Sequence, residues 1–193
     1  MQLLLASKSP RRRELLGRLG FPLTIVDIDV EEKVPATLCA AEVAEALACL
    51  KAGGYTAEMA ADEVLVTADT VVVLGNQLLG KPHSREEAVN MLHNLSGQAH
   101  QVYTGVCLRS TNRSIAFTER TDVHFRQLTD DEIGYYIDVF KPFDKAGAYG
   151  IQEWIGMIGI ERIEGCYYNV MGLPLARLYR ELVSLIGKEA MWR

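Results

Sequence analysis

The stretch EVLVTADTVVVLG, residues 63–75, decides the fold. It is almost continuously apolar, and Thr67, Asp69 and Thr70 interrupt its middle. This composition predicts a central, buried strand that bends or breaks at the aspartate. A carboxylate in a core must be hydrogen-bonded, paired with a cation or bound to a metal. Asp69 is therefore either a functional acid or a residue that satisfies backbone groups at a strand kink.

The sequence before this stretch predicts strands and helices in alternation. The apolar run at residues 2–6 predicts a strand, and Ser9 and Pro10 then provide the N-cap and first position of a helix. FPLTIVDIDV, residues 21–30, predicts a second strand that runs into two glutamates. Residues 37–54 predict a helix that ends at a glycine pair.

The sequence after it continues in the same way. We expect, in order, a helix with the capping box Ser84 and Glu87, a strand pair at residues 101–110 and 114–125, a helix capped by Thr129 and Glu132, an irregular functional loop at 141–152, strands within 156–165 and 166–172, and a last helix from Pro174. The irregular alternation predicts an α/β fold: a mixed sheet flanked by helices, as two lobes around a deep cleft.

Composition bounds the function. The chain has 193 residues, 49% of them hydrophobic and 23% charged, which is typical of one soluble domain spanning residues 1–193. A net charge of -5 argues against a protein that coats nucleic acid. No apolar run approaches the ~18 residues of a membrane span. Four cysteines without a C-x-x-C pair predict reduced core thiols, so we expect a cytoplasmic protein.

An arginine run stands at the predicted beginning of the first helix. Arg11, Arg12 and Arg13 occupy the first turn, where the helix dipole favours anions and disfavours cations by ~0.3–1 kcal/mol each. A phosphate there would accept bonds from free amides, from Ser7 and Ser9, and from guanidinium groups. The alternative is a set of three solvated surface arginines.

Further charged residues stand at predicted strand ends and loops. Glu31 and Glu32 follow a strand, and Mg²⁺ typically binds one or two carboxylates plus phosphate oxygens. Simple solvent exposure is the alternative, favoured for Glu32. Lys81 precedes Pro82 in a loop, and Lys145 lies in the irregular loop. No G-x-x-x-x-G-K-[ST] motif occurs, so phosphate binding would proceed without a Walker-type loop.

Several stretches carry a family resemblance. They are ASKSPRRRELL at residues 6–16, LVTADTVVVLG at 65–75 with LLGKP at 78–82, LSGQAHQVYTGV at 95–106, and DKAGAYGIQ at 144–152 with NVMGLPL at 169–175. Together, in collinear order over nearly the whole chain, they resemble the Maf family of nucleotide pyrophosphatases. The resemblance implies a Maf/ITPase-like α/β fold and hydrolysis of a nucleoside triphosphate to the monophosphate and pyrophosphate, with a divalent cation, Mg²⁺ or Mn²⁺, as cofactor.

The resemblance also implies roles for individual residues. Asp69 corresponds to the family's proton acceptor and Glu31 to its strand-end glutamate, and the two would be the catalytic acids and the metal ligands. The implied substrate-binding residues are Ser7, Arg11, Arg12, Lys51, Lys81 and Lys145.

The loop DKAGAYGIQ is similar to that of the branch preferring dTTP and UTP. Its specificity positions correspond to Arg12, Thr70 and Gln152, and an amide such as Gln152 can donate to a pyrimidine carbonyl and accept from the ring N–H. Two departures are Lys141, where the family usually has an acid, and Glu153 with Trp154 in place of a small glycine-containing turn. Modified pyrimidine nucleotides are further candidate substrates.

The expected partner is thus a nucleoside triphosphate in a nucleotide-pool cleansing role, with neither nucleic acid nor membrane, and the family suggests a homodimer. Two alternatives stand beside hydrolysis to pyrophosphate: a non-hydrolysing nucleotide-binding protein linked to cell division, and a phosphatase that frees orthophosphate.

Overall fold

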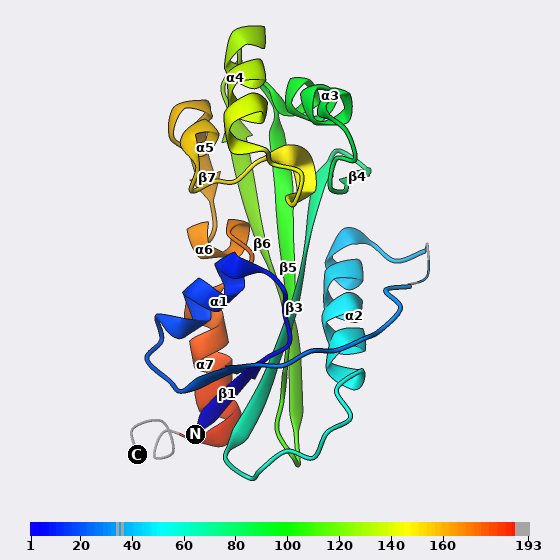
Figure 1. Cartoon of the computed structure of the whole chain (residues 1–193), viewed down its shortest axis with the longest axis vertical. Coiled ribbons are helices and arrows are strands. Elements are labelled where there is room, and N and C mark those ends of the chain that lie inside the picture. The colour runs from blue at the N-terminus through cyan, green and yellow to red at the C-terminus, as the bar shows by residue number, and fades with distance from the viewer. Residues whose placement is uncertain (34, 36, 188–193) are drawn as a thin grey trace. The chain divides into compact units, whose positions relative to one another are not determined.

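A seven-stranded mixed sheet with helices around it forms the framework of the computed structural model, which describes residues 1–33, 35 and 37–187 (Figure 1). The elements are β1 (Gln2–Leu5), α1 (Pro10–Gly17), β2 (Leu23–Ile25), α2 (Ala40–Gly53), β3 (Glu63–Leu74), β4 (Gln77–Leu79), α3 (Arg85–Leu95), β5 (Ala99–Arg109), β6 (Ser114–Phe125), α4 (Asp130–Phe140), the 3-10 helix η1 (Ala146–Ala148), α5 (Trp154–Gly159), β7 (Ile160–Glu164), α6 (Tyr167–Val170) and α7 (Leu175–Ile186).

The strand order is β2-β1-β3-β5-β6-β7, with β4 pairing β3 outside this path. β1 is parallel to both β2 and β3, whereas β4 is antiparallel to β3 and β7 is antiparallel to β6. The predicted α/β class with a mixed sheet is confirmed, and β3 is central as expected.

The chain divides into two compact units. Unit 1 comprises Met1–Asp69, Thr104–Glu119 and Gly172–Arg193, and unit 2 comprises Thr70–Tyr103 and Arg120–Met171. The boundaries fall inside β3, β5 and β6, so each of these long strands contributes to both units. Asp69 and Thr70, adjacent in β3, belong to different units. The cleft expected between two lobes stays a prediction.

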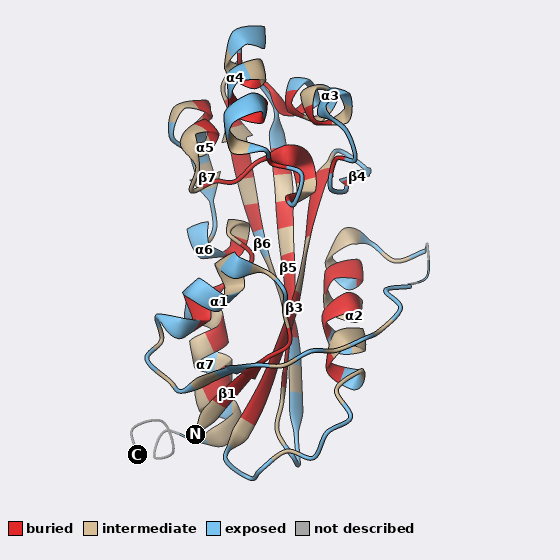
Figure 2. Ribbon diagram, in the orientation of Figure 1, coloured by how far each residue is buried: buried red, intermediate tan, exposed pale blue. Residues whose placement is uncertain are grey.

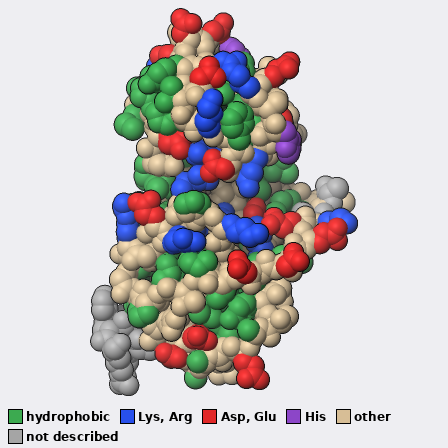
Figure 3. Space-filling model, in the orientation of Figure 1, with side chains coloured by type: hydrophobic (Ala, Val, Ile, Leu, Met, Phe, Trp, Pro, Cys, Tyr) green, Lys and Arg blue, Asp and Glu red, His purple; other side chains and the backbone are tan. Residues whose placement is uncertain are grey.

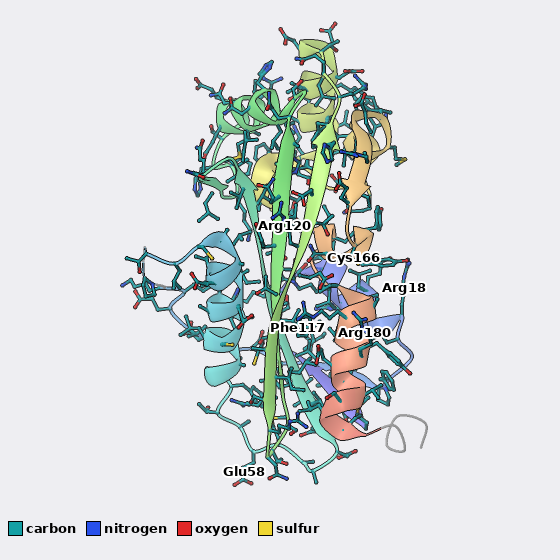
Figure 4. All side chains as sticks on the ribbon, turned by 180° about the vertical axis from the view of Figure 1, so that it is seen from behind. Arg18, Glu58, Phe117, Arg120, Cys166 and Arg180 are labelled. Atoms are coloured by element: carbon teal, nitrogen blue, oxygen red, sulfur yellow. The ribbon has the colours of Figure 1, made fainter. Side chains whose placement is uncertain are left out.

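In unit 1, helices cover both faces of the sheet. Alternate side chains of β6 point to opposite helices: the Phe117 ring lies under the Arg177 guanidinium of α7, and the Thr118 hydroxyl donates to the Ala41 carbonyl of α2. Figure 4 shows Phe117 on its strand, with α7 and α2 on either side. Close approach of α2 to β5 requires a glycine, because a Cβ on Gly105 would lie 2.2 Å from the Ala44 carbonyl carbon. This packing fixes α2, which carries Lys51.

Unit 2 has its own apolar core beneath α3, α4 and α5. Buried residues follow the inner faces of these helices and the adjoining strands (Figure 2). The predicted caps are present: the Ser84 hydroxyl accepts from Glu87 N, and Thr129 and Glu132 form a capping box. The acidic first turn of α4 is exposed and complements the helix dipole (Figure 3).

Four element predictions need correction, three of them before residue 166. The second strand is only Leu23–Ile25, because the exposed Asp27 and Asp29 break the apolar pattern beyond it, so the glutamates do not lie at a strand's end. β3 runs unbroken through position 69. The segment 154–159 is a helix, and only the residues from 160 onward form the predicted strand.

The segment 166–172, predicted as a strand, instead contains α6. Side-chain hydrogen bonds replace a strand ladder there. The Thr121 hydroxyl bonds both the N–H and the carbonyl of Cys166, and the buried Asn169 amide donates to the Val102 carbonyl at 3.0 Å. The chain therefore turns over the neighbouring strands rather than extending beside them.

Within the described residues, no helix is long and apolar enough to cross a membrane. The cysteines are free, as predicted, but only Cys107 is buried; Cys39 and Cys49 are exposed and Cys166 is half-buried. The prediction that all of them lie in the core is therefore wrong. Cys39 is instead the N-cap residue of α2, a position that faces solvent.

Candidate active site

The first turn of α1 has the predicted phosphate-binding features. The Ser9 hydroxyl caps the helix by accepting from Arg12 N at 3.4 Å, and the Ser7 hydroxyl accepts from Ser9 N at 3.2 Å. Pro10 occupies an initial helical position, and this turn contains no acidic side chain. The positive end of the helix dipole thus meets a basic sequence with no local acid to offset it.

The three arginines of this turn differ in their surroundings. Arg13 is exposed, which agrees with the surface alternative, whereas Arg11 and Arg12 are half-buried. Arg12 Nε donates to the Gly172 carbonyl at 2.9 Å. Burial lowers the pKa of Arg12, and the nearby Asp69 and Glu32 carboxylates partly offset this effect. The Arg12 guanidinium therefore lies among the acids of unit 1.

Lys51 joins the acids of unit 1 into one group. Its ammonium lies 2.6 Å from Asp69 and 3.1 Å from Glu32, and only 13% of the side chain is exposed. Arg109 of β5 fixes the end of α2 by donating to the carbonyls of Ala52 and Tyr55, each at 2.6 Å. Asp69, which is half-buried in β3, is thus paired with a cation rather than with backbone groups at a kink.

Glu31 lies apart from this group. Its side chain is 73% exposed and forms an ion pair with Lys33. Glu32 is exposed, as favoured from the sequence, yet it is the glutamate that contacts Lys51. Five residues separate Glu31 from Ile25, the last residue of β2, so strand geometry does not position it. We call Arg12, Glu32, Lys51 and Asp69 the unit 1 charge cluster.

Two carboxylates of the unit 1 charge cluster are side chains of the kind that divalent cations bind. Two carboxylates from different segments converge on one ammonium, so their oxygens already surround a positive charge. Among residues 1–33, 35 and 37–187, no group of three or more His, Cys, Asp or Glu side chains could hold a metal. One or two carboxylates completed by phosphate oxygens is the arrangement that Mg²⁺ commonly adopts.

The remaining predicted residues belong to unit 2. Lys81 is exposed in the loop before α3, and Lys145 is buried, with its ammonium 2.7 Å from Asp144 and 3.0 Å from Glu153. A hydrogen bond from Gly147 N to the Gly80 carbonyl, 3.0 Å long, joins the two loops. The structure thus brings the loops of Lys81 and Lys145 together.

Gln152 and Thr70 are the predicted specificity positions that lie in unit 2. The Gln152 Oε1 atom is buried and has no hydrogen-bond partner among the described residues. A buried amide oxygen without a partner is costly, which is expected where a ligand group completes the bond. Thr70 is half-buried in β3, directly after Asp69.

Two side chains near Gln152 were not among the predicted site residues. Tyr136, in the middle of α4, has no sequence signal beyond an apolar helix position. Glu153 had a signal, because it stands with Trp154 where the family resemblance indicates a small glycine-containing turn. In the structure the Tyr136 hydroxyl donates to the Glu153 carboxylate.

The protein is thus an α/β protein in which the arginine-rich first turn of α1 lies beside a lysine paired with carboxylates. The model of the family described as Maf-like protein matches residues 2–185, and the chain belongs to this family.

Comparison with other proteins agrees with this family assignment. A relative from Bacteroides thetaiotaomicron, named dTTP/UTP pyrophosphatase, is 51% identical over 185 residues, covering 95% of this chain and 96% of the relative. A relative of the same name from Flavobacterium psychrophilum is 45% identical over 183 residues, covering 95% and 94%. The structure of the Staphylococcus aureus Ham1 protein shares the fold, with a TM-score of 0.50, 18% identity and coverage of 94% and 100%.

Proposed function

We propose that the protein hydrolyses dTTP and UTP to the monophosphate and pyrophosphate. The relatives that carry this activity in their names are about half identical to it over almost the whole chain. The observation that carries the proposal is the contact of Lys51 with Asp69 at 2.6 Å beside the Arg12 guanidinium. Cations able to bind a polyphosphate and an acid able to accept a proton lie together.

The beginning of α1 binds phosphate oxygens in this proposal. Free amides of the first turn, the Ser7 hydroxyl and the guanidinium groups of Arg11 and Arg12 supply donors of the kind that bind phosphate at helix N-termini. The hydrogen bond from Arg12 Nε to the Gly172 carbonyl fixes the guanidinium end of that side chain. Lys51 adds positive charge that stabilises the departing pyrophosphate. Lys81 and Lys145 of unit 2 stay predicted substrate-binding residues.

Asp69 acts as the general base. Its carboxylate accepts a proton from a water molecule that attacks the α-phosphorus, and the bond from that phosphorus to the oxygen bridging the β-phosphate breaks. Lys51 orients the carboxylate through its short ion pair. β3 fixes the backbone of Asp69 between paired strands, which limits the movement of the base.

A divalent cation, Mg²⁺ or Mn²⁺, is part of the proposal. When bound, such an ion neutralises phosphate charge and lowers the pKa of a coordinated water. Asp69 and Glu32 would hold it, because both already contact the same ammonium. This assignment moves the second ligand from Glu31, which the family resemblance indicates, to its neighbour.

Base preference depends on Gln152 in this proposal. Uracil and thymine present an N–H donor beside carbonyl acceptors, and an amide complements both. The unpartnered Gln152 Oε1 is the acceptor that the ring N–H requires. Cytosine lacks that donor at the same ring position, so it would leave the oxygen unsatisfied.

Product analysis tests the proposal. The purified protein would be incubated with dTTP, UTP, dCTP, dATP, dGTP and modified pyrimidine triphosphates, with Mg²⁺, with Mn²⁺ and with a chelator. We expect the monophosphate and pyrophosphate, fastest from dTTP and UTP, and no turnover with the chelator. Release of orthophosphate would instead identify a phosphatase, and stoichiometric nucleotide retention without products would identify a non-hydrolysing binding protein.

A further inference from the structure

The turn at residues 150–153, which carries Gln152, is closed by a single hydroxyl from α4. The Tyr136 hydroxyl accepts a hydrogen bond from Gly150 N at 3.0 Å and donates to Glu153 Oε2. The Glu153 N–H in turn donates to the Gly150 carbonyl at 3.0 Å. Both ends of the turn are therefore bound to the same atom, and Gln152 lies between them.

The other oxygen of Glu153 is also bound. Glu153 Oε1 lies 3.0 Å from the Lys145 ammonium, and both side chains are mostly buried, with 20% and 9% exposed. A buried carboxylate is stable only when it is paired and hydrogen-bonded, and here each oxygen has a partner. Glu153 thus connects the beginning of the irregular loop to its end.

Glycine at position 150 makes room for this arrangement. A Cβ there would lie 2.9 Å from Glu153 Cδ and 3.1 Å from Gln152 Nε2. The amide that reads the base and the carboxylate thus share the space that a side chain would otherwise fill. On the far side, Gly156 lets α5 pack onto the Ile151 backbone, since a Cβ there would lie 2.0 Å from the Ile151 carbonyl oxygen.

The Tyr136 ring makes a rigid anchor. It is fully buried in the core of unit 2 and stacks on Phe140 at a centroid distance of 5.2 Å. A hydroxyl on such a ring has little freedom, so the groups bound to it share its fixed position. Burial, together with the bond to Glu153, raises the pKa of Tyr136 and keeps the hydroxyl protonated as a donor.

We infer that Glu153 and Tyr136 are positioning residues for base selection: they fix the turn so that the Gln152 amide presents one orientation to the pyrimidine ring. The inference rests on the proposed function for its substrate class. Tyr136 and Lys145 satisfy both oxygens of the mostly buried Glu153.

Selectivity between two bases tests the inference. We would measure kcat and KM for dTTP and dCTP with the wild type, Glu153→Ala and Tyr136→Phe. We expect each variant to lower the ratio of kcat/KM for dTTP over dCTP by about tenfold, through a raised KM for dTTP. The reason is that the Gln152 amide would no longer be held in one orientation, whereas the catalytic groups would be unchanged. The double variant should lose no more than the stronger single one, since both break one network.

Two matched variants serve as controls. Asp144→Asn removes the other carboxylate near Lys145 but leaves the Tyr136–Glu153 bond, so the selectivity ratio should stay at the wild-type value. Glu153→Gln keeps an oxygen that accepts from Tyr136 and keeps the shape of the side chain, so its ratio should stay near wild type even if Glu153→Ala folds poorly. Thermal melting of each variant verifies folding.

The contrary outcomes are distinct. An equal loss of activity towards dTTP and dCTP, or an unchanged ratio in both Glu153→Ala and Tyr136→Phe, overturns the positioning role. A wild type that releases no pyrophosphate overturns the proposed function instead. In that case, equilibrium binding of dTTP and dCTP to the same variants still measures whether Glu153 controls discrimination.

Discussion

Each unit of the molecule contains a lysine ammonium between two carboxylates, and the two groups differ in what surrounds them. Lys51 contacts Asp69 at 2.6 Å and Glu32 at 3.1 Å, and the Arg12 guanidinium lies near both acids. Lys145 contacts Asp144 and Glu153 at 2.7 and 3.0 Å.

The difference lies in the remaining oxygens. The second Glu153 oxygen binds a buried tyrosine hydroxyl that closes a turn, so this ion pair is part of the folded framework. In unit 1 Asp69 and Glu32 contact the Lys51 ammonium and lie near the Arg12 guanidinium, and Glu32 is half exposed. A lysine between two carboxylates can therefore take part in a reaction in one unit and stabilise a loop in the other, depending on the groups that bind the remaining carboxylate oxygens.

The largest expected effect separates the two groups by activity. Replacing Asp69 by Asn removes the proposed general base but keeps its size, so turnover of dTTP should fall by roughly 10²–10⁴-fold while nucleotide binding persists. Asp144→Asn is the matched variant in unit 2, and its ratio of kcat/KM for dTTP over dCTP should stay at the wild-type value. Single-turnover kinetics and equilibrium binding measure both quantities; near-normal turnover by the Asp69 variant would remove this residue from the base role.

A second prediction concerns the stability of unit 2 as a function of pH. His100 is fully buried beside Phe125, its Nε2 lies 2.7 Å from the Tyr149 hydroxyl, and burial lowers its pKa to about 4, assisted by His124 and opposed by Asp122. In the unfolded chain the pKa is 6.5. Between pH 6.5 and 4 the unfolded state binds the extra proton, so the free energy of unfolding falls as the pH is lowered through this window.

The free energy of unfolding lost through His100 should reach about 3 kcal/mol. The pKa of His100 differs between the unfolded and folded states by roughly 2.5 units, and each unit corresponds to ~1.4 kcal/mol. Urea unfolding at several pH values, for the wild type and for His100→Gln, measures it. The glutamine can still bond Tyr149 but does not titrate, so the slope between pH 6.5 and 4 should be shallower in the variant. Parallel slopes would contradict the prediction.

A third prediction compares the lysines directly. Lys145→Met leaves the mostly buried Glu153 carboxylate without its cation, so the free energy of unfolding should fall by about 2 kcal/mol. Lys51→Met should lower it less, because the Arg12 guanidinium remains near Asp69, and because Glu32 faces solvent, where its charge can be hydrated. Urea unfolding at pH 7 measures both. A larger loss for Lys51→Met would reverse our assignment of a structural role to the unit 2 group.

Sequence patterns predicted most elements because their signals are local. Caps at Ser84 and Thr129, the buried run at residues 63–75 and the helix that carries Lys51 depend on residues a few positions apart, and the structure confirms them. The failure at residues 166–172 has a non-local cause. The Asn169 side chain of that segment bonds to β5 and β6, more than forty positions away in sequence, and no periodicity in the sequence indicates such bonds.

The candidate site was predictable to the extent that charge is unusual in its local context. An aspartate inside an apolar run and arginines at a helix beginning both contradict local preference, and both belong to the unit 1 charge cluster. The choice between adjacent glutamates was not predictable, because either fits a loop. Tyr136 was not predictable either, since its hydroxyl acts on residues that follow it by 14 and 17 positions.

The smallest expected effect settles the choice between the two glutamates. Glu32→Gln removes a carboxylate that contacts Lys51, so we expect turnover to fall by about tenfold at low Mg²⁺ and to recover partly as Mg²⁺ is raised, since a weakened ligand set needs more metal for occupancy. Glu31→Gln changes a side chain that is 73% exposed and paired with Lys33, so turnover should change by less than about twofold. Titration of activity against Mg²⁺ concentration for both variants measures this. If Glu31→Gln instead shows the larger Mg²⁺ dependence, the metal ligand is the one that the family resemblance indicates, and Glu32 serves only to hold Lys51.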